Sequence, residues 1–182
     1  RYMEVWNVVF SQFNNDGHGN YTDLVQKNID TGMGLDRTVA TLQGVKSVYD
    51  TDAFSGIIAT IAELSGKQYG ESEEITRMFR IIADHIRCAT FMLGDQRGIT
   101  PSNVDQGYIL RRLIRRAIRF STQLGIPDGS LSAIAEAVIA QYGDFYHELR
   151  DNHDKIMDEL TKEEQRFEHA LKKGIREFER LA

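Results

Sequence analysis

The spacing of hydrophobic positions changes once along the chain, near residue 44. Before that point, residues 4–13 (EVWNVVFSQF) are rich in Val, Phe and Trp and end at an Asn-, Asp- and Gly-rich run typical of a hairpin loop. Residues 21–30 predict the returning strand, which residues 31–34 would close. Residues 34–43 then show helical spacing. The first 44 residues therefore predict two strands and a short helix.

After residue 44 every apolar pattern has the period of an α-helix. Ser72 and Ser102 are suited to be N-caps, and Asp105 would complete an imperfect capping box with Ser102. The expected fold class is mainly α, preceded by a short antiparallel β-hairpin, with one domain over residues 1–44 and a second over 45–182. The predicted helices of the second part cover about 51–66, 72–93, 102–120, 131–142 and 145–182.

The last predicted helix carries an apolar seam that needs a partner helix. The seam lies among many Glu, Lys and Arg residues and consists of Leu160, Phe167, Leu171, Phe178 and Leu181. We expect it to pack against the predicted helices 107–120 or 131–141. A coiled-coil dimer is the alternative.

The composition is that of an ordinary globular protein, with 182 residues, 41% hydrophobic residues and a net charge of −5. The single cysteine, Cys88, excludes an internal disulfide, and no apolar run approaches the roughly 20 residues of a membrane span. The histidines lack metal-ligand spacing, so we expect no metal site. The chain begins at Arg1, inside strand-like sequence and without a signal peptide, which favours a piece of a longer cytoplasmic protein.

One predicted helix is strongly basic in this acidic chain. Residues 100–120 contain five arginines and one acidic residue, a local balance of 5 − 1 = +4. At about 100° per residue all five guanidinium groups fall within one arc of about 140° and the aliphatic residues fall opposite. The five form the arginine stripe: Arg111, Arg112, Arg115, Arg116 and Arg119.

The arginine stripe has two interpretations of equal weight. Planar, permanently charged guanidinium groups suit phosphate oxygens, which predicts contact with nucleic acid. The alternative is pairing with acidic residues elsewhere in the fold, since residues 107–120 contain none of their own. Some arginines are expected to serve each purpose.

A second candidate site lies at the end of the second predicted strand, in DTGMGLDR. It combines a carboxylate, Asp30, two glycines that allow close backbone approach, Gly32 and Gly34, and an arginine one turn into the next helix, Arg37. This arrangement can hold a cationic group at the carboxylate and a nucleotide near the arginine. The pattern is weak by itself, because Asp-Thr-Gly also forms routine turns.

Four separated motifs, in order and spacing, closely resemble the alanyl-tRNA synthetase family. They cover nearly the whole chain: EVWNVVFSQFNNDGHGNYTDLVQKNIDTGMGLDRTVATLQG, YDTDAF, RIIADHIRCATFML and ITPSNVDQGYILRRLIRRAIRF. The resemblance implies the end of a class II synthetase catalytic domain, with the motif 3 helix, followed by a helical domain that recognises the acceptor stem of tRNA(Ala). It further implies ATP-dependent activation of alanine, with Mg²⁺ in the parent enzyme, then transfer to tRNA. Motifs 1 and 2 are missing, so we expect the chain alone to be inactive.

The resemblance also assigns roles to single residues of the hairpin. It implies that Asp30 binds the α-ammonium of alanine, that Gly32 lines the side-chain pocket, and that Arg37 packs on ATP and stabilises phosphate charge. Gly34 belongs to the same substrate site. Three residues of the first strand, Trp6, Asn7 and Val9, resemble positions near the alanine pocket. Strand alternation puts Asn7 and Val9 on one face and Trp6 on the other, so only one of these two sets can line the site directly.

In the helical part, Asn103 resembles the asparagine that reads a G·U pair in the acceptor stem. An amide just ahead of an arginine stripe can probe base edges in the shallow RNA minor groove while the arginines hold the backbone. Without the resemblance, a capping or turn asparagine would be the favoured interpretation. The resemblance implies tRNA(Ala), alanine and ATP as partners, and neither DNA nor a membrane. The competing class is a non-catalytic helical module that binds RNA or protein.

Overall fold

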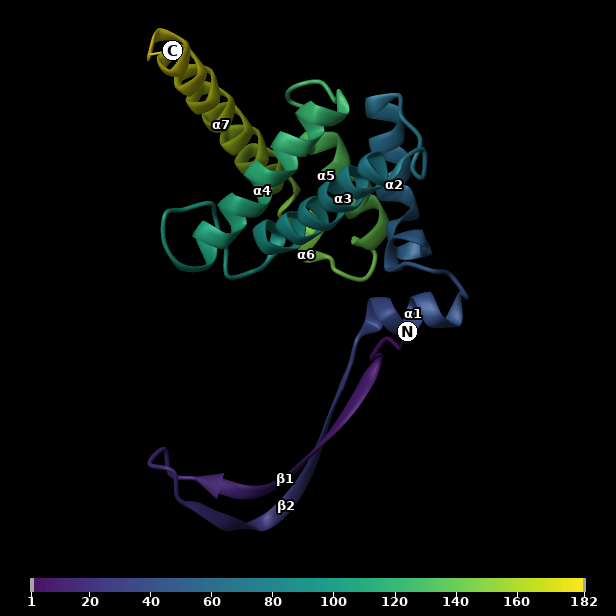
Figure 1. Cartoon of the computed structure of the whole chain (residues 1–182), viewed down its shortest axis with the longest axis vertical. Coiled ribbons are helices and arrows are strands. Elements are labelled where there is room, and N and C mark those ends of the chain that lie inside the picture. Colours follow the sequence, from purple (N-terminus) through teal and green to yellow (C-terminus); the bar gives the residue numbers. More distant parts are fainter. Residues whose placement is uncertain (1, 182) are drawn as a thin grey trace. The chain divides into compact units, whose positions relative to one another are not determined.

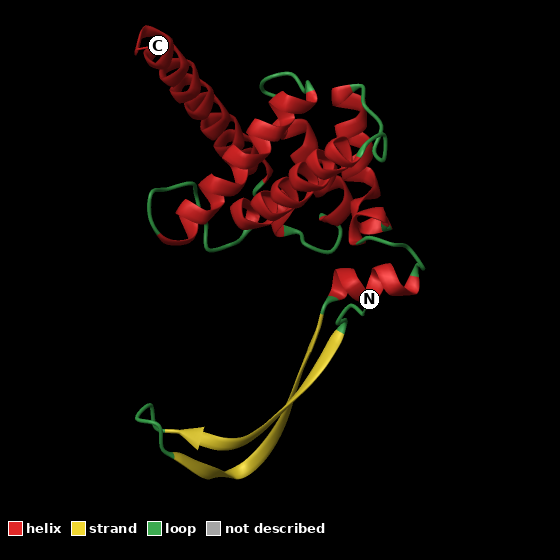
Figure 2. Cartoon of the chain, viewed as in Figure 1, coloured by secondary structure: helices red, strands yellow, loops and turns green. Residues whose placement is uncertain are grey.

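A computed structural model describes residues 2–181, without the side chains of residues 172, 175, 179 and 181. It contains a two-stranded sheet and a set of helices (Figures 1 and 2). The chain divides into two compact units, the first ending at Thr51 and the second beginning at Asp52. The mainly helical character and the antiparallel hairpin predicted from the sequence are confirmed. The domain boundary at residue 44 stays a prediction.

The first unit is a long hairpin followed by short helical segments. Strand β1 (Trp6–Asn15) pairs antiparallel with β2 (Tyr21–Met33), and α1 (Leu35–Leu42) and a 3₁₀ turn, η1 (Val48–Asp50), follow. Residues 31–33 do not close the strand as predicted. They continue the ladder opposite residues 6–8, because the backbone from Gly32 to Gly34 is not in a turn conformation and Gly34 itself is extended, with φ −79°.

The hairpin has almost no core of its own. Large apolar side chains stand exposed on both faces, with Phe10 at 74% exposure on one face and Val9 at 52% on the other. Among the described residues of this unit, only Ala40 is a buried apolar side chain. An isolated pair of strands is at best marginally stable in water, so this unit depends on covering surfaces for its stability.

The second unit is a bundle of helices around α3, with a continuous aliphatic and aromatic core. Its helices are α2 (Asp52–Ser65), α3 (Glu73–Gly94), α4 (Asp105–Leu124), α5 (Leu131–Tyr142), α6 (Glu148–Asp151) and α7 (His153–Leu181). Helix α3 packs against every other helix of the unit. The largest fully buried side chains include Phe54, Phe79, Ile82, Leu93, Leu110, Ile114 and Ile134. The predicted amphipathic faces are therefore the faces that form the core.

The predicted helix over 145–182 is wrong as one element, because the chain breaks at Asn152 between α6 and α7. The side-chain amide of Asn152 donates to the carbonyl of Gly94, at 2.9 Å, and Lys155 Nζ donates to the carbonyl of Leu93, also at 2.9 Å. Carbonyls at a helix C-terminus have no partner within the helix. The break thus supplies donors to the end of α3.

Helix α7 packs on α4 and α5 through its first half, as the seam predicted. Leu160 is fully buried and Phe167 half-buried, whereas Leu171 is 48% and Phe178 73% exposed. Figure 1 shows the C-terminal half of α7 extending away from the other helices of its unit. The seam is therefore covered only up to about Phe167, and the Leu181 side chain lies outside the described residues.

Glu164 belongs to α7, and its buried carboxylate contacts the turn that precedes α5. Its Oε1 accepts from the backbone N–H of Gly129 at 3.0 Å, in the turn that leads into that helix. Burial, with a smaller contribution from the charge of Glu168, raises the pKa of Glu164 from 4.5 to about 7, against the opposing effect of the Gly129 hydrogen bond. The folded protein therefore holds a proton on Glu164 more tightly than the unfolded chain does.

The free energy of unfolding should decrease as the pH rises from about 4.5 to about 7, because a group with a raised folded-state pKa stabilises the fold only while it is protonated. Glu164→Gln, which keeps the acceptor but cannot ionise, should remove this part of the pH dependence, on the order of 2–3 kcal/mol. Urea unfolding at several pH values measures it. Glu177→Gln, an exposed site on the same helix, is the control, and an equal change in both variants would contradict the assignment.

Candidate functional site

The hairpin register brings four of the predicted substrate residues onto one face. Val9 is directly opposite Asp30, and Asn7 is directly opposite Gly32. Cross-strand partners share a face, and so do residues two apart on a strand. Asn7, Val9, Asp30 and Gly32 therefore form a contiguous surface, called here the Asp30 face.

The Asp30 face is polar, open and shaped by the missing side chain at Gly32. A Cβ placed on Gly32 would contact only the Oδ1 of Asn7, at 3.4 Å, so nothing in the hairpin itself requires a glycine there. The amide of Asn7 is held by Glu4, whose Oε1 accepts from Nδ2 at 3.2 Å. One oxygen of Asp30 accepts from the backbone N–H of Thr31, at 2.8 Å. This bond orients the carboxylate beside the space over Gly32.

Arg37 lies in the first turn of α1 and reaches back to the strand entry. Its Nη1 donates to the backbone carbonyl of Glu4, at 3.0 Å. Its aliphatic stem runs beside Gly34, where an added Cβ would come within 3.3 Å of Arg37 Cδ. The glycine at position 34 thus gives the arginine stem room. The remaining guanidinium donors of this exposed side chain are available for an anion.

Trp6 does not join the Asp30 face. It is opposite Met33 in the register and lies on the other side of the strand pair. Its indole N–H donates to the hydroxyl of Thr31, which in turn donates to the backbone carbonyl of Asn7 at 2.9 Å. Of the two alternatives for the first strand, the register favours Asn7 and Val9 as the residues next to Asp30.

The start of α4 differs from the prediction, since Ser102 is not its N-cap and Asp105 is the first helical residue. Ser102 Oγ instead donates to the carbonyl of Val104 at 2.8 Å, and its backbone N–H donates to the carbonyl of Gly107 at 3.0 Å. The loop can fold over this first turn because Gly107 has no side chain. A Cβ there would lie 2.5 Å from the carbonyl oxygen of Thr100.

Asn103 is exposed at the tip of this folded loop and contacts the arginine stripe. Arg111 Nη1 donates to its side-chain oxygen, and Arg111 Nη2 donates to the carbonyl of Pro101 at 3.4 Å. Close by, Asp105 has a positive φ of 48°, an uncommon conformation for a residue with a side chain. The loop geometry thus presents the amide of Asn103 at the N-terminal end of α4.

The arginine stripe divides into two groups. Arg115 Nε donates to Glu163 Oε1 at 2.7 Å, and Arg111 Nε lies 3.3 Å from the same oxygen. Glu163 belongs to α7 and its side chain is fully buried. Arg115 also stacks over the ring of Phe167, at 5.3 Å from its centroid. Structural pairing is therefore confirmed for Arg111 and Arg115.

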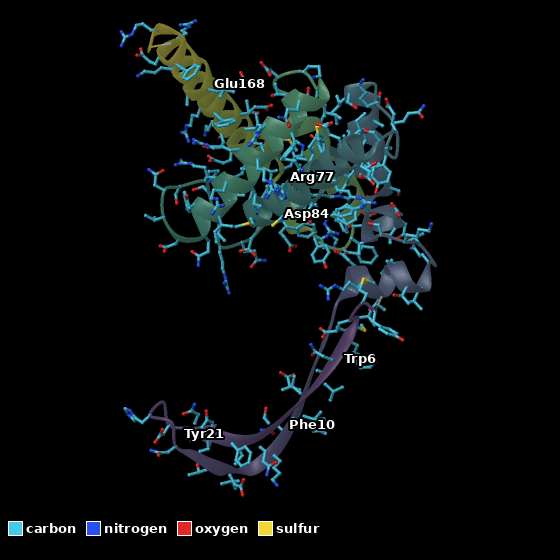
Figure 3. All side chains as sticks on the ribbon, in the orientation of Figure 1. Trp6, Phe10, Tyr21, Arg77, Asp84 and Glu168 are labelled. Atoms are coloured by element: carbon cyan, nitrogen blue, oxygen red, sulfur yellow. The ribbon has the colours of Figure 1, made fainter. Side chains whose placement is uncertain are left out.

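The other three arginines of the stripe, Arg112, Arg116 and Arg119, are exposed. Within the described residues none of the three has an ion-pair partner within 4.0 Å, although each guanidinium lies near an aromatic ring. Arg116 and Arg119 line a groove of about 410 Å³ between α3 and α4, together with Arg77 and Glu74 of α3. Figure 3 marks Arg77 on that helix. This part of the stripe is open to an anionic partner.

Two functional candidates, Arg77 and Glu163, were not predictable from the sequence. Arg77 is one of three arginines on α3, and its place beside Arg116 depends on how α3 packs on α4. Glu163 is one of many acidic residues in the last predicted helix.

A hydrogen bond from His85 lowers the pKa of a further acidic neighbour of the stripe, Asp84, and Arg116 adds to this effect.

The described residues contain no group of three or more His, Cys, Asp or Glu side chains that could hold a metal ion. In the same part of the chain, no helix has the length and apolar character needed to cross a membrane.

The whole chain, residues 1–182, matches the sequence model of the family described as tRNA synthetases class II (A), and it belongs to this family. Proteins named alanine–tRNA ligase are among its relatives. That of Borreliella afzelii is 51% identical over 98% of this chain, and that of Treponema pallidum is 48% identical over 100%. That of Exiguobacterium sibiricum is 46% identical over 96%. The chain spans 30% of the length of the first two proteins and 20% of the third.

The two groups of arginines should differ in their effect on stability. Arg115→Ala removes the hydrogen-bonded partner of the buried Glu163 carboxylate, leaving Arg111 at 3.3 Å and Arg166 at 4.0 Å, and should lower the free energy of unfolding by roughly 1–3 kcal/mol. Arg112→Ala, on the exposed part of the same helix, should change it by no more than about 0.5 kcal/mol. Urea unfolding at one pH measures both. Equal losses would show that the stripe is not divided as described.

Proposed function

We propose that the chain is a segment of an alanine–tRNA ligase, which activates alanine with ATP and transfers it to tRNA(Ala) in the cytoplasm. The observation that carries this proposal is the identity of about half of all residues to proteins of that name over nearly the whole chain. The Asp30 face supports it, because a carboxylate beside an open glycine suits a small amino acid. The exposed arginines support the RNA partner.

In this proposal the hairpin contributes part of the aminoacylation site. Asp30 accepts hydrogen bonds from the α-ammonium of alanine, and the space over Gly32 takes its methyl group. Asn7 and Val9 border that space, and Trp6 supports the strand pair from the other face. Arg37, with room made by Gly34, stabilises negative charge on ATP as the alanine carboxylate attacks the α-phosphate. The family implies Mg²⁺ with ATP, but the described residues form no acidic cluster for it, so we assign it no step here.

The helical unit is proposed to bind the acceptor stem of the tRNA. Arg112, Arg116 and Arg119 contact backbone phosphates and fix the register of the stem, while Asn103 reads a base pair. Arg77 adds a third arginine to the groove that Arg116 and Arg119 line. Arg111 and Arg115 support the helix from its paired side. The net charge is −5 for the whole chain but +4 for residues 100–120, which fits a protein that binds RNA through one basic face.

Catalysis should depend on Asp30. In the full-length protein that contains this chain, Asp30→Ala should reduce kcat/KM for alanine in ATP–pyrophosphate exchange by at least about 100-fold, because the ammonium loses its charged partner. Asp30→Asn, which keeps the shape, should lose nearly as much. The 182-residue chain alone should show no exchange above background. Full activity of Asp30→Ala would instead favour a non-catalytic binding module.

RNA recognition should separate into affinity and selectivity. Asn103→Ala should remove the preference for a G·U-bearing acceptor stem over its G·C counterpart while most affinity remains. Arg112→Ala should weaken both stems alike and lower the slope of log affinity against log salt by about one. Fluorescence anisotropy with the two RNA duplexes measures both effects. A loss of preference in Arg112→Ala, or its retention in Asn103→Ala, would contradict these roles.

A further inference from the structure

The side-chain amide of Asn103 has a defined orientation, because Arg111 donates a hydrogen bond to one of its two ends. Arginine has five N–H donors and no acceptor, so the atom of the amide that faces Arg111 must be the oxygen. The NH₂ group of Asn103 is therefore the part left for another molecule. Without this contact an exposed asparagine can rotate and offer either its oxygen or its nitrogen.

Arg111 is in turn held from the protein interior. Its side chain is only 17% exposed, and its Nε lies 3.3 Å from Oε1 of Glu163, whose side chain is fully buried. Its Nη2 donates to the carbonyl of the buried Pro101 at 3.4 Å. The Nε–Oε1 contact is an ion pair without hydrogen-bond geometry, so the carboxylate holds the guanidinium by charge, while hydrogen bonds from Nη2 to Pro101 and from Nη1 to Asn103 set its direction.

We infer that Glu163 is a positioning residue for base-pair selectivity, acting through Arg111 on Asn103. This inference rests on the proposed function, since it assumes that Asn103 reads the acceptor stem. The buried carboxylate fixes Arg111, Arg111 engages the amide oxygen, and the reading group then offers only hydrogen-bond donors to the RNA. Its ligand at this position is accordingly a base-edge acceptor. A freely rotating amide would also accept donors and would discriminate less.

The neighbouring arginine supplies a matched control. Arg115 contacts the same oxygen of Glu163, at 2.7 Å, but within the described part of the chain it forms no hydrogen bond with Asn103. Arg111→Met and Arg115→Met each remove one partner of Glu163 and one positive charge. Only the first removes the contact with the amide. Glu163→Gln is the second test, because it removes a buried charge and leaves the exposed surface unchanged.

The first measurement needs no RNA. In a ¹H–¹⁵N spectrum of the chain, the side-chain NH₂ resonances of Asn103, assigned with Asn103→Asp, should shift in Arg111→Met and in Glu163→Gln but not in Arg115→Met. Circular dichroism confirms that each variant is folded. Unshifted resonances in Glu163→Gln, or an equal shift in Arg115→Met, would overturn the positioning role whatever the RNA binding shows.

The second measurement is the ratio of dissociation constants for the G·C-bearing and G·U-bearing stems. This ratio should fall by roughly tenfold in Arg111→Met and Glu163→Gln, the size of one lost base-edge contact, and stay unchanged in Arg115→Met. If the NH₂ resonances shift while the ratio is unchanged, the inference of a selectivity role is wrong. If the wild-type chain itself shows no preference between the two stems, the proposed recognition of the base pair by Asn103 is wrong. The NH₂ resonances then test only whether Glu163 positions Asn103 through Arg111.

Discussion

The buried carboxylate of Glu163 ties α4 to α7 in the helical unit of this chain. Glu163 lies out of contact with water and can stay there only with cationic partners, because an unpaired charge in the interior costs several kcal/mol. Both Arg111 and Arg115 therefore have to face α7. Since α4 is a rigid helix, fixing these two side chains also fixes the direction in which the other three arginines point. The exposed positions of Arg112, Arg116 and Arg119 therefore follow from the ion pairs that Arg111 and Arg115 form with Glu163.

The local patterns of the sequence predicted most of the fold. Helical periodicity identified the faces that form the core, and alternation along the first strand separated Trp6 from Asn7 and Val9. Two features were not predictable because each depends on a residue distant in the chain, and a third depends on a close local approach. Arg115 and Glu163 are 48 residues apart, and Asn152 breaks the last helix to serve the end of α3, 58 residues earlier. The late start of α4 depends on the close approach at Gly107.

The two candidate sites differ in how much of them this chain supplies. Strand pairing places all four residues of the Asp30 face side by side. The strand pair itself buries little area, so its geometry needs support from other surfaces. The arginine helix, in contrast, is packed on α3 and α7 within a well-formed core. The sequence suggested candidate residues for both sites, but not Arg77 or Glu163. It could not distinguish the arginines that bind inward from those that face outward, since all five share one arc of the helix.

The loop over the first turn of α4 has a consequence for engineering. Asn103 takes its position from Ser102 and Gly107, and its orientation from Arg111, which depends on a different helix. A synthetic peptide with the sequence of α4 would keep the positive charge and lose this arrangement. The arrangement around Asn103 therefore belongs to a tertiary assembly of α4, its preceding loop and α7, and grafting the helix alone onto another scaffold would transfer the positive charge without that arrangement.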